Sequence, residues 1–139
     1  MTQEFYGTDL AKYKLERARE ELDTAELLFE NEKLKAANNR AYYSIYYSLT
    51  AVLCLEPIAF KRHKDTIGYF NKNYVHTGLF PGKIGRNISK AAKVRHASDY
   101  DEFYIASKEE AEKQIQTAKI LAELVDKYIS ERSNGKNSQ

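Results

Sequence analysis

The chain has 139 residues, 42% of them hydrophobic and 30% charged, and these proportions allow one domain with a core of its own. Its single cysteine, Cys54, excludes an internal disulfide and lies in an apolar run, so we expect a core thiol. No apolar stretch approaches the ~20 residues of a membrane-spanning helix, and the first residues lack a secretion-signal pattern. We therefore expect a cytoplasmic protein.

The formal net charge of +2 conceals an uneven distribution of charge along the chain. Residues 33–98 carry 12 Lys/Arg and 2 Asp/Glu, whereas residues 1–32 carry 4 and 9, and residues 99–139 carry 6 and 9. Between Asp65 and Asp99 there is no carboxylate. A surface that attracts polyanions or an acidic partner is the expected consequence.

The first predicted helix begins at Asp9, a typical N-cap residue, and is amphipathic. Its apolar residues recur at steps of 3 and 4: Leu15, Ala18, Leu22, Ala25 and Phe29. A second helix is expected over residues 36–55, where the sequence is apolar or aromatic on nearly every side, as in a central helix. Pro57 ends it because proline removes a backbone donor.

The second half of the chain is also predicted to be helical. We expect a short helix over residues 65–74, a loop over 78–82 and a third long helix over 83–97. The last helix opens at Ser107, whose spacing to Glu110 is that of a capping box.

These elements predict an all-α fold, an antiparallel up-and-down bundle of four long helices plus one short helix. The bundle forms one domain over residues 1–132. A tail over residues 133–139 has no apolar side chain and is expected to be disordered.

A basic stripe runs along the third long helix, since four cations step by 3, 4 and 3 residues: Lys83, Arg86, Lys90 and Lys93. Such a stripe is typical of a phosphate track, in which cations displace counterions from a nucleic-acid backbone. It is also typical of an ordinary solvated helix face, or of a stripe that neutralises acidic neighbouring helices. The two interpretations have nearly equal weight.

Residues 38–47 combine tyrosines with one arginine, and on a helix Arg40 shares a face with Tyr43 and Tyr47. Tyrosine rings can stack on bases and arginine can bind phosphate. Buried tyrosines are also common in helical cores. We interpret most of these tyrosines as structural or dimer-interface residues and keep Arg40 as a candidate ligand-binding residue.

A third cluster surrounds Arg95. Arg95 and Asp99 are four residues apart and could form a simple surface ion pair. The alternative is a functional cluster in which Arg95 holds phosphate and His96 or Tyr100 transfers protons. The ion pair is the simpler interpretation.

The histidines do not predict a metal centre. His63, His76 and His96 lack ligand spacing with one another and with Cys54, so we expect neither a metal nor a cofactor.

Three motifs in order resemble the HEPN superfamily, most closely its small stand-alone bacterial and archaeal members. They are Asn39-Arg40-Ala41-Tyr42-Tyr43, then Arg95-His-Ala-Ser-Asp99-Tyr100, then Ser107-Lys-Glu-Glu-Ala111. The resemblance implies a helical bundle that forms a homodimer, often paired with a minimal nucleotidyltransferase in a toxin-antitoxin system. It also implies a metal-independent ribonuclease built on an arginine, four to six intervening residues and a histidine.

Tyr100 stands where that motif places its histidine relative to Arg95. Tyrosine, with an ordinary pKa of ~10, is a poorer acid-base group at neutral pH. The leading hypothesis is therefore a dimer that binds RNA or nucleotide phosphates, with a site made of five residues: Arg40, Lys90, Lys93, Arg95 and Asp99.

Two rival hypotheses remain open. One is a ribonuclease with an unusual catalytic set of Arg95, His96 and Tyr100. The other is a pure protein-interaction subunit. In pairs of this kind the partner can modify a tyrosine, which here would be Tyr100 or Tyr104.

Overall fold

The computed structural model describes residues 2–137, and the side chains of residues 7–133. It contains six helical elements in chain order: α1 (Thr2–Glu30), α2 (Leu34–Leu53), α3 (His63–Phe70), the π-helical turn η1 (Asn71–Val75), α4 (Gly82–Tyr100) and α5 (Lys108–Asn137). The described residues include no strand, so the predicted all-α class is confirmed. Within this part of the chain, no helix combines the length and apolarity that crossing a membrane requires.

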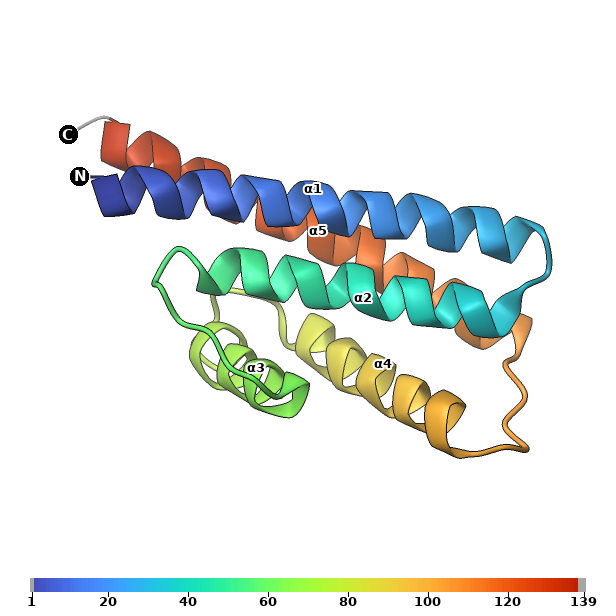
Figure 1. Ribbon diagram of the computed structural model, residues 1–139. Coiled ribbons are helices and arrows are strands. Elements are labelled where there is room, and N and C mark those ends of the chain that lie inside the picture. The colour runs from blue at the N-terminus through green and yellow to red at the C-terminus, as the bar shows by residue number, and fades with distance from the viewer. Residues whose placement is uncertain (1, 138–139) are drawn as a thin grey trace.

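The helices form an up-and-down bundle in which α1, α2 and α5 lie side by side (Figure 1). The chain reverses direction from α1 to α2, so the two helices are antiparallel, and α5 returns toward the end where α1 begins. α4 packs on α2 and, to a lesser extent, on α5, while α3 covers part of α2. The predicted bundle architecture is thereby confirmed.

The core depends on small residues of α1 that permit close helix packing. Ala11, Ala18 and Ala25 recur at every seventh position and are fully buried, with Leu15 and Leu22 between them. The spacing keeps all five residues on one helix face, and the alanines let α1 approach its neighbours closely. α2 is buried on several sides, as its sequence predicted.

α1 begins earlier than the sequence indicated. Asp9 was predicted to be its N-cap, but α1 starts at Thr2 and Asp9 lies inside it. Gly7 lies inside the helix. A Cβ at this position would stand only 3.3 Å from the carbonyl oxygen of Cys54. Glycine therefore allows α1 to approach the end of α2, and this packing outweighs the local N-cap preference.

The start of α5 uses half of the predicted capping box. The backbone N–H of Glu110 donates to Ser107 Oγ at 3.0 Å, as predicted. The Glu110 carboxylate, however, accepts a hydrogen bond from the Tyr104 hydroxyl. At its other end, α5 continues to Asn137 and so includes residues 133–137 of the predicted tail. The last two residues of that tail, 138 and 139, lie outside the described residues.

Candidate functional site

Arg95 lies on the inward side of α4, in helical register with the buried Ile88. Its Nη2 donates a hydrogen bond to the Tyr43 hydroxyl of α2 at 3.0 Å, and its Nε lies 3.4 Å from Asp99 Oδ2. Its guanidinium carbon is 5.1 Å from the centre of the Tyr42 ring, within cation–π range. The ion pair expected from the sequence is present, and α2 holds the same guanidinium.

Tyr43 contacts two arginines. The guanidinium carbons of Arg40 and Arg95 are 5.1 and 5.4 Å from the centre of its ring. Arg40 also pairs with Glu21 of α1, with 2.8 Å between Nη1 and Oε2. The side chains of Arg40 and Arg95 remain 40% and 30% exposed, so both can still meet a ligand. The structure thus brings Arg40 and Arg95 to one tyrosine, with Asp99 paired to Arg95.

His63, the first residue of α3, belongs to the same cluster. Its Nδ1 lies 2.9 Å from the Tyr42 hydroxyl, and its ring stacks on Tyr46 with 3.8 Å between ring centres. Burial lowers the pKa of His63, and the positive charge of Arg95 lowers it further. From the sequence, we considered His63 only as a possible metal ligand. Its place beside Arg95 was not predicted, because Arg95 lies 32 positions further along the chain and no local pattern links the two residues.

The tyrosines of α2 are mainly structural, in agreement with the sequence interpretation. Tyr42 is 3% exposed, and burial raises its pKa to about 12 although Arg95 opposes the shift. Tyr46 shares a hydrogen bond of 3.0 Å with Thr66 Oγ1 of α3. This hydrogen bond and the contacts of Tyr42 and Tyr46 with His63 hold α3 against α2.

His96 and Tyr100 are not brought to Arg95. Both are exposed, Tyr100 by 76%, and their rings pair with each other at 4.7 Å between centres. Successive residues of an α-helix point about 100° apart, so the inward Arg95 directs its neighbour His96 away from the site. No contact between Arg95 and either ring is found among the described side chains.

Lys90 and Lys93 also point away from Arg95, because their positions lie on another face of α4. With Lys83 they line a groove of about 900 Å³ between α4 and α5. The opposite wall carries carboxylates of the first turns of α5: Glu109, Glu110 and Glu112. Across the residues with described side chains, no ion pair joins the basic stripe to these carboxylates. All four cations of the stripe are exposed, with acidic groups nearby.

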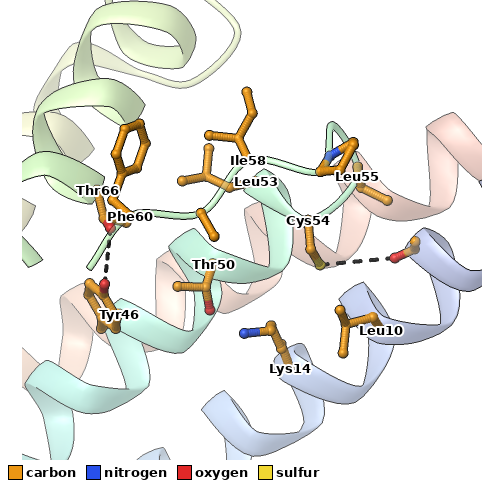
Figure 2. Close-up of a pocket in the computed structure, with 13 residues that line it drawn as sticks. Leu10, Lys14, Tyr46, Thr50, Leu53, Cys54, Leu55, Ile58, Phe60 and Thr66 are labelled. Atoms are coloured by element: carbon orange, nitrogen blue, oxygen red, sulfur yellow. Dashed lines mark hydrogen bonds between the residues drawn. The ribbon is translucent and has the colours of Figure 1, made fainter. Parts of the chain in front are cut away.

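A second hollow, of about 680 Å³, lies between α1, the end of α2 and the segment that leads to α3 (Figure 2). Its lining is mainly apolar, with Lys14 and Cys54 among the polar or reactive groups. Cys54 is half-buried here and packs against the core without lying inside it, so the expected core thiol is only partly confirmed. The reason is that α2 ends at Leu53 and the chain leaves the bundle at this point. Burial still raises the pKa of the thiol, so it is a weak nucleophile.

The described residues contain no group of three or more His, Cys, Asp or Glu side chains that could hold a metal ion. The groups between α2 and α4 are guanidinium, imidazole and phenol groups, with the Asp99 carboxylate beside Arg95. The first three kinds of group bind anions by charge and by hydrogen bonding.

Fold and site together define an all-α bundle with an arginine and tyrosine cluster between its second and fourth helices. The sequence matches the family model described as HEPN domain over residues 11–128. The match spans most of the chain, and the protein belongs to the HEPN family.

Several relatives match over most of their own length. A UPF0332 protein of Thermotoga maritima is 31% identical over 122 residues, which are 88% of this chain and 92% of that protein. Putative toxin MJ0605 of Methanocaldococcus jannaschii is 33% identical over 117 residues, covering 84% of this chain and 87% of the relative. Putative toxin MJ0142 of the same organism is 30% identical over 124 residues, covering 89% and 84%.

Proposed function

We propose that this HEPN protein binds RNA or nucleotide phosphates as a homodimer, and that it forms a toxin-antitoxin-like pair with a minimal nucleotidyltransferase. The observation that carries the proposal is the pair of partly exposed guanidinium groups, of Arg40 and Arg95, that both lie within cation–π range of the Tyr43 ring. Planar guanidinium groups present several donors to phosphate oxygens, and partial burial strengthens the attraction.

Asp99 is the group that a phosphate would displace. Its ion pair with Arg95 is an i,i+4 contact at 3.4 Å between side chains that are 30% and 32% exposed. Pairs of this kind contribute only a few tenths of a kcal/mol. A phosphate can therefore replace the carboxylate at small cost and retain the hydrogen bond from Arg95 to Tyr43.

The basic stripe adds a positive field on the other side of α4. Arg86, Lys90 and Lys93 are exposed, and none has an ion pair within the described chain. A nucleic-acid backbone that follows the α4 wall of the groove would release counterions at each cation. Carboxylates on the opposite wall, formed by α5, would repel the backbone, so the α4 wall is the favoured track.

The test is fluorescence anisotropy with a labelled single-stranded RNA, comparing the wild type with an Arg95→Ala, Lys90→Ala, Lys93→Ala variant. Lys12→Ala with Lys119→Ala and Lys127→Ala is the matched control, because it also removes three positive charges and these exposed lysines of α1 and α5 do not line the groove. We expect the first variant to lose at least tenfold in affinity and the control to lose little. Equal affinities for the wild type and the triple variant would refute the proposal.

The homodimer and partner proposals rest on the family and on an exposed apolar patch at the junction of α4 and α5. Tyr100, Phe103 and Ile105 are 76%, 89% and 87% exposed. Exposed apolar clusters of this kind are typical of interaction surfaces. Light scattering should give a dimer for the wild type and a monomer for Phe103→Ser with Ile105→Ser, whereas Leu79→Ser, also at an exposed residue, should stay dimeric. A monomeric wild type contradicts the dimer.

The ribonuclease hypothesis has less support from the geometry. The catalytic set predicted for it needs His96 or Tyr100 beside Arg95, and both rings face away from Arg95. A pure protein-interaction role is supported only by the exposed patch. Unchanged RNA affinity in the triple variant, together with copurification of a partner protein, would favour this role.

A further inference from the structure

The Arg95 site contains one group that neither the basic stripe nor the HEPN motif accounts for, the imidazole of His63. Arg95 and His63 border the same two tyrosine rings. The guanidinium carbon lies 5.1 and 5.4 Å from the centres of Tyr42 and Tyr43, and the imidazole centre lies 5.8 and 6.2 Å from them. The fold thus brings a cation of α4 and an imidazole of α3 to one place on α2.

The Tyr42 hydroxyl determines which nitrogen of His63 carries the proton. Tyr42 is 3% exposed, and among the described residues its hydroxyl has one hydrogen-bond partner, His63 Nδ1 at 2.9 Å. A buried hydroxyl proton without an acceptor costs more free energy than a hydroxyl oxygen that accepts no hydrogen bond. The hydroxyl therefore donates to Nδ1. The neutral imidazole then carries its proton on Nε2.

We propose that His63 is a second phosphate-binding group of the Arg95 site, presenting Nε2–H beside the guanidinium, and that Tyr42 is the positioning residue that holds this tautomer. This deepens the proposed function and rests on it. A neutral imidazole adds a donor without adding a charge that Arg95 would repel. Its position at the start of α3 also favours the neutral ring, since the positive end of a helix dipole disfavours an imidazolium.

The tautomer also has a chemical consequence. With Nδ1 accepting from Tyr42 and Nε2 protonated, the neutral ring has no free lone pair with which to remove a proton from a ribose hydroxyl. His63 can donate to a phosphate oxygen but cannot act as a general base. The arrangement suits recognition of a phosphate-bearing ligand.

The tautomer can be measured without any ligand. Long-range ¹H–¹⁵N correlation spectra distinguish Nε2–H from Nδ1–H imidazoles, and His63→Gln assigns the His63 signals. We expect the Nε2–H pattern in the wild type and a loss of this preference in Tyr42→Phe. An Nδ1–H pattern at His63 in the wild type would overturn the proposal.

The binding role is tested with the same labelled RNA. His63→Phe combined with Tyr42→Phe keeps a ring stacked on Tyr46, removes the Nε2–H donor and leaves no unpaired hydroxyl. It should bind about tenfold more weakly than Tyr42→Phe alone. His63→Gln, which retains an N–H donor, should lose no more than about threefold, and the exposed His76→Phe should lose nothing.

The outcomes separate the two proposals. If Arg95→Ala weakens binding and the double variant matches Tyr42→Phe, the assignment of His63 is wrong while the proposed function stands. If Arg95→Ala leaves affinity unchanged, the proposed function itself fails. Circular dichroism checks the fold of each variant, and the wild-type tautomer decides the Tyr42 assignment even if a variant does not fold.

Discussion

Arg95 of α4 donates a hydrogen bond of 3.0 Å to the hydroxyl of Tyr43 of α2, and this contact joins residues 52 positions apart. It turns a residue that would otherwise form a surface ion pair inward, onto an aromatic surface. The candidate site exists because two helices meet at this point.

The contact should be visible in a double-mutant cycle on folding stability. Arg95→Ala and Tyr43→Phe each remove one partner, and we expect a coupling of about 1 kcal/mol because the bond is charge-assisted and half-buried. The control cycle joins Arg17 and Tyr47, where the guanidinium carbon lies 5.5 Å from the ring centre and the Arg17 side chain is more exposed than that of Arg95. Its coupling should be smaller, because water screens the exposed Arg17 guanidinium. Equal couplings in urea denaturation would contradict the special role of the Arg95 contact.

The salt dependence of RNA binding should report the basic stripe. Each phosphate contact to a single strand adds about 0.7 to the slope of log affinity against log salt concentration, so Lys90→Ala and Lys93→Ala should each lower that slope by about 0.7. Titrations at several salt concentrations measure the slope. If Lys119→Ala has the same effect, the attraction comes from overall charge and not from the stripe.

His63 should make folding stability depend on pH. Its pKa in the folded protein is lowered by burial and by Arg95, below the 6.5 of an ordinary histidine. As pH falls through about 6.5, the unfolded chain takes up a proton at this residue and the folded protein does not, so stability decreases. The decrease from this group ends below the folded-state pKa. Urea midpoints at about pH 7.5 and about pH 5.5 should therefore differ more in the wild type than in His63→Gln. Identical differences would show that His63 is not perturbed.

Two glycines should respond oppositely to alanine. A Cβ at Gly85 of α4 would stand 2.8 Å from Val75 Cγ1 and 3.1 Å from Asn71 Oδ1, so Gly85→Ala must push α4 away from η1 and should cost about 1–3 kcal/mol. A Cβ at Gly68 of α3 would meet nothing within 4 Å. Gly68→Ala should stabilise the protein by about 0.5–1 kcal/mol through helix propensity. Thermal unfolding measures both, and a neutral Gly85→Ala would mean that the helices are more loosely packed.

Helical periodicity was sufficient to predict the bundle, because amphipathic spacing such as Leu15, Ala18 and Leu22 encodes both the helix and its buried face. It failed at Asp9, where packing of Gly7 against the end of α2 extends the helix. In the site, the Arg95–Asp99 pair was predictable because it is local. The contribution of His63 was not, since it depends on how α3 lies against α2. The separation of Lys90 from Arg95 follows from helix geometry and could have been calculated from the sequence.

The most direct test of the central claim is incubation of labelled single-stranded RNA with the protein in EDTA, read by both anisotropy and a denaturing gel, beside Arg95→Ala. The account predicts salt-sensitive binding, intact RNA and at least tenfold weaker binding by the variant. Fragments that disappear in Arg95→Ala would mean an enzyme, and affinity unchanged by the variant would mean that Arg95 is not part of a phosphate site.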